Sequence, residues 1–258
     1  MKSFKQGNIE LINTDCMGYM KTLPDNAFDL VITSPPYNMN LRVNAKGSGY
    51  CSRQVVKEIS TKYENYSDNL PMDEYFEFLS GFISEACRVS DLVFLNIQMI
   101  TGNKPALFNA IGKHSDKLKE VIVWDKVVAQ PSIADKTMNS AFEFIFVFGG
   151  NPIARQFKSA NFDKGTCSNI WRIKPSRRSA DNHGAGFPKA LPETIIRQFA
   201  KPDARILDPF LGTGTTAIAA YNAGMGFVGL EIDQSYFEFA CERFSRETSQ
   251  VDMFGGVA

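Results

Sequence analysis

One segment restricts the possible folds of this chain more than any other: an apolar strand that passes through a glycine-rich turn into a helix, residues 206–216 (ILDPFLGTGTT). Glycines in such a turn let the backbone approach a ligand that side chains would exclude. Gly212, Gly214 and Ala217 also satisfy the GxGxxA pattern. Glu231, at the end of the next expected strand, can accept hydrogen bonds from both hydroxyls of a ribose. The segment predicts a site for an adenosine-containing cofactor, with a turn that binds no ligand as the alternative.

Strand and helix patterns alternate along the rest of the chain. Apolar segments typical of strands lie at 9–13, 28–33, 91–97, 121–124, 141–148, 204–208 and 226–230. Helical spacing of apolar residues occupies 73–89, 215–223 and 234–246. This alternation predicts an α/β fold, a doubly wound, Rossmann-like sheet with helices on its faces. Aromatic residues at every second position from Phe142 to Phe148 share one face of their strand, and we expect that face to be core.

The composition is that of a globular chain, with 258 residues, 44% hydrophobic and 22% charged. No apolar run reaches the roughly 18–20 residues of a membrane helix, and the N-terminal segment lacks the pattern of a signal peptide. We therefore expect a cytoplasmic protein with no membrane partner. The five cysteines are scattered and only two histidines are present, so we also expect reduced cysteines and no metal site.

Positive charge is concentrated in two segments, although the net charge is zero. Residues 38–63 carry five basic side chains against one acidic (net +4), and residues 153–178 carry seven against one (net +6). Apolar periodicity also fades over 38–72 and 149–186, which predicts two long loops. Basic loops on a neutral protein suit a polyanion bound on one face, although solvated loops of this composition are common.

A second motif ends the expected strand 28–33 with Ser34-Pro35-Pro36-Tyr37. Each proline fixes its own φ and holds the preceding residue in an extended conformation. The Ser34 hydroxyl and the adjacent carbonyl are therefore held at the carboxyl edge of the sheet, where open α/β sheets bind ligands. Two such acceptors can hold both hydrogens of a planar amine while Tyr37 stacks on its ring. A proline-rich loop without a ligand is the alternative.

Together, ITSPPY and DPFLGTGTT resemble the DNA amino-methyltransferases, which use S-adenosylmethionine to methylate an exocyclic amine of a base. The motif order, SPPY first, is similar to the β circular arrangement of that family. The resemblance covers nearly the whole chain and implies one methyltransferase domain (1–258), S-adenosyl-L-methionine as cofactor, and double-stranded DNA in a bacterial, phage or archaeal cell. The stretch between Phe148 and Phe187 is short for the target-recognition region of that family.

The resemblance also assigns roles to residues. Catalysis is implied for Ser34, Pro35, Pro36 and Tyr37. The pair at 15–16, between the strand 9–13 and a short expected helix, matches the acidic contact to the cofactor adenine. The segment 187–192, which opens the expected helix before the strand 204–208, matches the cover of the methionine end of the cofactor. The implied cofactor contacts are Asp15, Cys16, Thr33, Phe187, Pro188, Asp208, Pro209, Phe210, Gly212, Gly214, Thr215 and Glu231. The candidate DNA contacts lie in the two basic loops: Arg42, Lys46, Arg53, Arg172, Lys174, Arg177 and Arg178.

In the implied mechanism, Ser34 Oγ and the Pro35 carbonyl hold the hydrogens of a flipped-out base amine, whose exposed lone pair then attacks the methyl group. Within that family, Ser before Pro-Pro is the form most often associated with the cytosine amine, whereas Asp in its place is more typical of adenine enzymes. We therefore predict methylation of cytosine N4, with adenine N6 as the alternative. A related site of the NPPY type could instead methylate RNA or a glutamine of a protein.

Two other classes of protein are compatible with parts of the sequence. A nicotinamide dehydrogenase would account for the glycine-rich turn but not for the SPPY motif. A non-catalytic nucleic-acid-binding module would account for the basic loops but not for the turn. The C-terminal tail, Gln250–Phe254 (QVDMF), after a helix expected to end near Glu247, resembles the short peptides by which bacterial DNA enzymes bind the replication sliding clamp. Its apolar pair could instead fold back onto the sheet or onto a homodimer partner.

Overall fold

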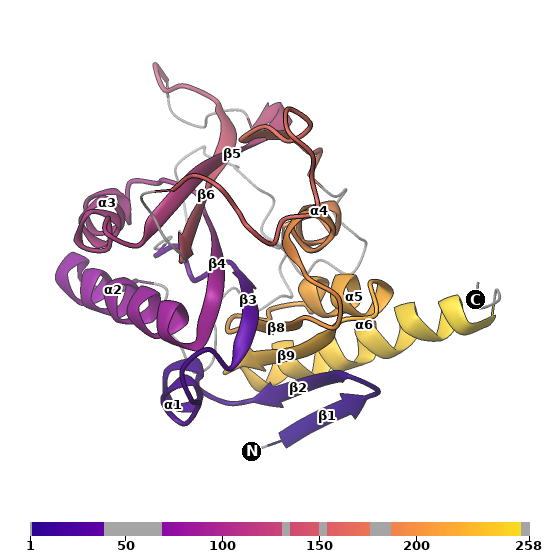
Figure 1. The fold of residues 1–258 in the computed structure, drawn as a ribbon. Helices are drawn as coiled ribbons and strands as arrows, with labels where there is room; N and C mark the ends of the chain where they lie inside the picture. Colours follow the sequence, from indigo (N-terminus) through magenta and orange to yellow (C-terminus); the bar gives the residue numbers. More distant parts are fainter. Residues whose placement is uncertain (1, 39–68, 131–134, 150–153, 176–186, 254–258) are drawn as a thin grey trace.

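The computed structural model describes residues 2–38, 69–130, 135–149, 154–175 and 187–253. Within these ranges, nine strands form one sheet in the order β1-β2-β9-β8-β3-β4-β6-β5-β7 (Figure 1). The strands are β1 (Lys2–Gln6), β2 (Ile9–Asn13), β3 (Phe28–Thr33), β4 (Ser90–Ile97), β5 (Leu118–Gln130), β6 (Ser140–Gly149), β7 (Ile170–Arg172), β8 (Arg205–Asp208) and β9 (Gly226–Glu231). The helices are α1 (Cys16–Lys21), α2 (Met72–Val89), α3 (Lys104–Lys113), α4 (Ala190–Phe199), α5 (Thr215–Asn222) and α6 (Gln234–Met253).

The sheet has a parallel centre. Strands β2, β9, β8, β3 and β4 run parallel to one another, whereas β1 is antiparallel to β2, and β6 is antiparallel to both β4 and β5. After β8 the chain crosses through α5 to β9 on one side, and after β3 it crosses through α2 to β4 on the other. The sheet order therefore reverses between β8 and β3, the place where doubly wound sheets form a crevice at their carboxyl ends.

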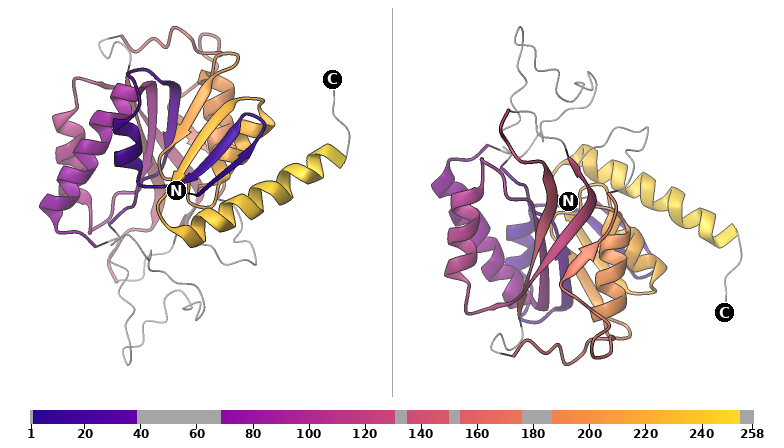
Figure 2. Two further views of the ribbon diagram at one scale, coloured as in Figure 1. Left: turned by 90° about the horizontal axis from the view of Figure 1, so that it is seen from below. Right: turned by 90° about the horizontal axis from the view of Figure 1, so that it is seen from above.

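Helices cover both faces of this sheet, α1 to α3 on one and α4 to α6 on the other (Figures 1 and 2). Strand β3 shows how the sequence permits this arrangement. Leu30 and Ile32 pack toward α4 and α5, while Val31 packs toward α2, and all three are buried. Strands that are buried on both faces need such continuous apolar runs. The predicted doubly wound sheet is confirmed.

Several local expectations differ from the structure. The edge strand β1 and helix α3 are additions to the predicted elements, and β7 interrupts the predicted loop 149–186 by pairing in parallel with β5. Three residues are too few for a periodic pattern, and β7 is held by burial of Trp171 against Phe199. The aromatic face of β6 is core only in part, because Phe146 is buried but Phe142, near the start of the strand, is 42% exposed.

The last helix is longer than the sequence indicates. Instead of ending near Glu247, α6 continues to Met253, so most of the Gln250–Phe254 segment belongs to the helix rather than to a tail after it. In Figure 2 the C-terminal half of this helix projects away from the sheet. Phe254 lies outside the described residues. No helix in the described ranges has the length and apolar character needed to cross a membrane.

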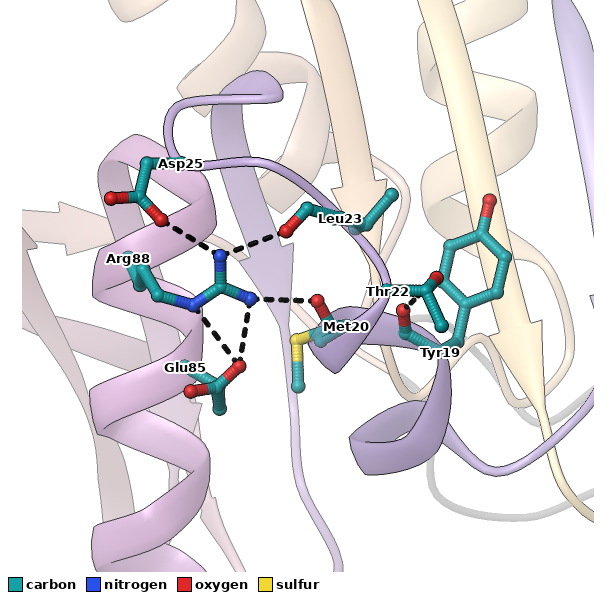
Figure 3. Close-up of polar contacts among 7 residues, drawn as sticks. All are labelled: Tyr19, Met20, Thr22, Leu23, Asp25, Glu85 and Arg88. Carbon is teal, nitrogen blue, oxygen red and sulfur yellow. Dashed lines mark hydrogen bonds and ion pairs between the residues drawn. The ribbon is translucent and has the colours of Figure 1, made fainter.

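One arginine ties the short helix α1 to α2 (Figure 3). The guanidinium of Arg88, in the last turn of α2, donates to the carbonyls of Met20 and Leu23 at 2.8 and 2.9 Å. It also pairs with Asp25 and Glu85, both at 2.9 Å. This clamp holds the end of α1, and the other end of the same helix opens onto the crevice between β8 and β3.

Candidate active site

A cavity of about 290 Å³ occupies the carboxyl edge of the sheet at the reversal between β8 and β3. The loops after β2, β3, β8 and β9 all reach it. Most of the predicted site residues line it: Asp15, Cys16, Ser34, Pro35, Pro36, Tyr37, Phe187, Asp208, Pro209, Phe210, Gly212 and Thr215, with Glu231. Further lining residues, which were not predicted from the sequence, include Thr14, Met17, Phe78, Thr213, Ile232 and Tyr236. The two motifs therefore meet in one cavity.

The SPPY segment is held from behind by hydrogen bonds to its backbone. Tyr75 Oη donates to the Pro36 carbonyl at 2.7 Å, and Asn103 Nδ2 donates to the Tyr37 carbonyl at 3.0 Å. The Pro35 carbonyl, by contrast, accepts no hydrogen bond from the residues that the structure describes. This leaves two candidate acceptors on the cavity wall, that carbonyl and Ser34 Oγ.

Ser34 begins a buried polar chain that the sequence reasoning missed. Ser34 Oγ donates to Tyr37 Oη at 2.9 Å, and Tyr37 Oη donates to Glu143 Oε2, also at 2.9 Å. Lys126 Nζ lies 2.8 Å from the other oxygen of Glu143. Glu143 is on β6 and Lys126 on β5, so only the sheet pairing brings them to the SPPY segment. The one sequence signal for this contact was the presence of a charged residue, Glu143, inside the aromatic strand 141–148.

Asn96, at the end of β4, completes this chain. Its Nδ2 donates to Tyr37 Oη at 2.9 Å and to Glu143 Oε2 at 2.7 Å. Its Oδ1 is the one buried side-chain N or O atom without a partner in the part of the chain that the structure describes. An unsatisfied buried acceptor costs about 1–3 kcal/mol. The two acceptors, Tyr37 and the Glu143 carboxylate, therefore orient the Asn96 amide, and this orientation leaves Asn96 Oδ1 without a hydrogen bond from the described residues.

The hydroxyl group of Tyr37 is neutral in this series of hydrogen bonds. Burial, and next the Glu143 carboxylate, raise the pKa of Tyr37 well above its usual value. Its single hydrogen therefore stays in place at neutral pH. The tethered hydroxyl also holds the ring at the cavity wall, so the ring can contact a planar ligand.

Asp208, at the end of β8, is held by two threonines. Thr33 Oγ1 and Thr216 Oγ1 donate to its two carboxyl oxygens, each at 2.6 Å, and the Phe210 amide donates at 3.1 Å. Burial raises the pKa of Asp208 to about 6 despite these bonds. Thr33 itself is fully buried behind Asp208 and does not line the cavity, so it acts on the site through this carboxyl group.

Glu231, at the end of β9, faces the glycine-rich turn. Its two oxygens accept from the amides of Gly212 and Asp233, both at 2.9 Å. Burial raises the pKa of Glu231 to about 7. Gly212 has φ +53°, a conformation that favours glycine, and no protein atom crowds the position that a Cβ would take. An open backbone and a buried carboxylate therefore lie side by side on the cavity wall.

Two other residues around the glycine-rich turn have structural roles. Gly214 has φ +80° and packs so closely on Ala240 of α6 that an added Cβ would lie 3.3 Å from the Ala240 side chain. It does not line the cavity. From α6, Arg243 Nη1 donates at 3.0 Å to Thr213 O, Thr213 Oγ1 and Thr215 Oγ1. Arg243 fixes the turn from outside, and no local sequence pattern points to it.

Helix α1 closes the cavity on the side of β2. Asp15 caps this helix by accepting from the Gly18 amide at 2.6 Å. Cys16 is buried, and burial raises the pKa of its thiol to about 12, so it presents a neutral, apolar surface. On the opposite side Phe187 lines the cavity, whereas Pro188 is buried beside α4 and does not.

The predicted DNA contacts are only partly described. Arg172, on β7, is exposed and lies 3.4 Å from Asp125, and Lys174 is exposed beyond the strand. Arg42, Lys46, Arg53, Arg177 and Arg178 lie outside the described residues. Among the described residues there is no group of three or more His, Cys, Asp or Glu side chains placed to hold a metal ion.

The cavity thus combines two chemically different walls. One presents Glu231, Asp208 and an open glycine backbone, which can bind hydroxyl and amine groups. The other presents Ser34 Oγ and the Pro35 carbonyl, which can hold the two hydrogens of an amine. Apolar side chains around both walls, such as Phe78 and Phe210, limit the access of water. This arrangement can place an amine beside a bound nucleotide.

Comparisons with known proteins agree with this geometry. The model of the DNA methylase family (N6_N4_Mtase) matches residues 28–242. The type II methyltransferase M.BglII from Bacillus subtilis is 26% identical over 97% of this chain and 72% of its own length. Among solved structures, the cytosine-N4-specific PvuII DNA methyltransferase matches with a TM-score of 0.67 and 17% identity, over 95% of this chain and 93% of that one. TTHA0409 from Thermus thermophilus, solved with S-adenosyl-L-methionine, matches with a TM-score of 0.59 and 23% identity, over 92% and 95%. The chain belongs to the DNA methylase family.

Proposed function

We propose that this DNA methyltransferase transfers a methyl group from S-adenosyl-L-methionine to N4 of a cytosine in double-stranded DNA. The observation that carries the proposal is that Ser34 Oγ lines the same cavity as Glu231 and Gly212. The printed specificity of the PvuII enzyme supports the choice of base, and the ligand of TTHA0409 supports the choice of cofactor.

The cavity fits this cofactor on its own chemistry. Glu231 would accept hydrogen bonds from the ribose hydroxyls, and Gly212 would allow close approach of the backbone. Asp208 would face the amino group of the methionine moiety, with Phe187 as an apolar cover. Asp15 and Cys16 would contact the adenine. When bound, the cofactor supplies an electrophilic methyl group.

The residues of the other wall would activate the base. The exocyclic amine of cytosine is conjugated with the ring and is a poor nucleophile. Ser34 Oγ and the Pro35 carbonyl accept its two hydrogens, which favours the pyramidal form with an exposed lone pair. Catalysis then consists of positioning and electrostatics, without a covalent enzyme intermediate.

The amine of a base pair lies inside the duplex, so the cytosine must flip out, at a cost of a few kcal/mol in lost stacking. Basic residues such as Arg172 and Lys174 would hold the distorted backbone through phosphate contacts. A homodimer, and binding of the Gln250–Phe254 segment to a sliding clamp, stay predictions. Comparing clamp binding of the full chain with that of a chain ending at Ser249 tests the second.

Mass spectrometry of nucleosides tests the proposed function directly. DNA treated with the protein and labelled S-adenosylmethionine is expected to yield N4-methylcytosine. N6-methyladenine alone would assign the same chemistry to adenine, the alternative base. No methylated nucleoside of either kind, under conditions where the cofactor binds, would contradict the proposal.

Reversing the charge of the second basic loop is expected to weaken DNA binding. For Arg177→Glu/Arg178→Glu, the slope of log K against log salt should fall by about one unit for each lost phosphate contact. Cofactor affinity should not change. Lys5→Glu/Lys21→Glu is the matched control, because both lysines are exposed and lie toward the amino edge of the sheet, away from the cavity. An unaltered slope in the arginine variant would make this segment a solvated loop.

A further inference from the structure

We propose that Glu143, held by Lys126 and acting through Tyr37, is a positioning residue that turns the Ser34 hydroxyl hydrogen away from the cavity, so that Ser34 presents only acceptor lone pairs to the target amine. The proposal rests on the proposed function, since it explains how the amine acceptor is kept in the correct orientation. The side chains involved form a hydrogen-bonded series that runs from Ser34 on the cavity wall through Tyr37 to Glu143 in the sheet behind it.

The direction of the chain follows from counting hydrogens. A carboxylate can only accept, so the hydrogen of Tyr37 Oη points at Glu143 Oε2, 2.9 Å away. Tyr37 then has no hydrogen left for Ser34, and the bond of 2.9 Å between the two hydroxyls must use the Ser34 hydrogen. With its hydrogen directed at Tyr37, Ser34 Oγ offers only lone pairs to a ligand in the cavity.

The orientation depends on Glu143 acting as an acceptor, and its other contacts match that role. Lys126 and Glu143 are only 3% and 7% exposed, and 2.8 Å separates Lys126 Nζ from Glu143 Oε1. A buried carboxylate needs such a partner. Asn96 Nδ2 adds a second donor to Glu143 Oε2, and its own Oδ1 is left without a partner as a result. Both neighbours therefore act as donors toward this one side chain.

The backbone next to Lys126 is strained. Val127 has φ +65°, the left-handed region, which a β-branched residue rarely adopts. The register of β5 and β6 also shifts here, after Asp125 opposite Phe142. Irregularities of this kind persist where the surrounding structure requires them, and they occur next to active sites. Strand β5 thus pairs regularly with β6 from Glu120 to Asp125, the residue before Lys126, and loses this pairing directly afterwards.

Replacing Glu143 with glutamine is expected to reverse the direction of these hydrogen bonds while leaving the shape of the side chain at position 143 nearly unchanged. Lys126 can only donate, so it attracts the oxygen of the new amide and leaves the NH2 group facing Tyr37. Tyr37 Oη and Asn96 Nδ2 thereby lose the acceptor that they share in the wild type. Asn96 Nδ2 still donates to Tyr37 Oη, so Ser34 Oγ is the acceptor that remains for the Tyr37 hydrogen. The Ser34 hydrogen in turn points into the cavity, where it opposes the hydrogens of the amine.

The first experiment measures single-turnover methyl transfer with DNA and S-adenosylmethionine both saturating. Glu143→Gln is expected to be slower than the wild type by roughly 10- to 100-fold, in the range for a misdirected polar group in an active site. The dissociation constants for cofactor and DNA should stay within about twofold. Glu120→Gln is the matched control, because Glu120 is on β5 and paired with an arginine, Arg155, but lies away from the cavity. It should match the wild type.

A double-mutant cycle separates positioning from a structural effect. Tyr37→Phe cuts the link between Ser34 and Glu143, so adding Glu143→Gln to Tyr37→Phe should change the rate by less than about threefold. If the single variant does not fold, Lys126→Met/Glu143→Gln removes both charges and lets the amide oxygen turn back to Tyr37. That variant should transfer methyl groups at close to the wild-type rate.

Three results would each overturn the proposal. The first is a wild-type rate for Glu143→Gln, and the second is a pair of rate effects of Glu143→Gln and Tyr37→Phe that simply multiply in the double variant. The third is a slow Lys126→Met/Glu143→Gln variant that binds cofactor normally. These results differ from a failure of the proposed function, in which the wild type itself would produce no methylated base.

Discussion

Ser34→Ala is expected to slow methyl transfer by roughly 10- to 1000-fold while leaving cofactor affinity nearly unchanged. The substitution removes one of the two acceptors for the amine hydrogens, but alanine can keep the extended backbone that the following prolines impose. Ser34 makes its side-chain bond to Tyr37, not to the wall formed by Glu231 and Asp208. The loss should therefore appear in the chemical step.

Single-turnover kinetics with saturating cofactor provide the measurement, together with cofactor binding by calorimetry. Pro35→Ala is the comparison, because alanine keeps the second acceptor, the carbonyl, and should have a milder effect. An unchanged single-turnover rate for Ser34→Ala would remove Ser34 from the catalytic residues, whichever base is methylated.

Glu231→Gln is expected to weaken S-adenosylmethionine binding by roughly 10- to 100-fold, since a charge-assisted hydrogen bond contributes about 1.5–3 kcal/mol. The amide is nearly isosteric, but it has one acceptor oxygen where the carboxylate has two. In the free protein these two oxygens already accept from the amides of Gly212 and Asp233. The NH2 group of glutamine would face one of those amides and disturb the turn.

The pH dependence of binding makes this test sharper. Because burial raises the pKa of Glu231 to about 7, the free protein holds a proton on Glu231 below that pH, and ribose binding has to expel it. Cofactor affinity of the wild type should therefore rise from about pH 6 to about pH 8 and level off above. Asp208, with a pKa of about 6, would add a further decline only at lower pH.

Calorimetric titrations of both proteins across this range check the prediction. The cofactor has ionisable groups of its own, and these affect the two proteins equally, so the difference between wild type and Glu231→Gln isolates the contribution of Glu231. Parallel curves for the two proteins would contradict the role of Glu231. The same raised pKa means that folded Glu231 binds its proton more tightly than the unfolded chain does, so its contribution to stability falls as pH rises from about 4.5 to about 7.

Structural features that depend only on residues close together along the chain could be predicted from the sequence. The apolar run 28–33 forms β3 with the predicted bounds, because a strand buried on both faces needs continuous apolar residues. The prolines after Ser34 and the glycine at position 212 specify their own backbone conformations. The central strands, the turns after them and the two motifs were therefore predictable, as was their meeting at the carboxyl edge, which follows from the rule for doubly wound sheets.

Tertiary structure alone decided which side chains stand behind those motifs. Glu143 lies 106 positions along the chain from Tyr37, yet sheet pairing brings it, together with Lys126, to the Tyr37 hydroxyl. Arg243 reaches the glycine-rich turn from a different helix. The β7 strand and the long end of α6 depend on packing as well. Hydrogen bonds and ion pairs act over about 3 Å in space, whereas a sequence pattern reports only residues that are close along the chain.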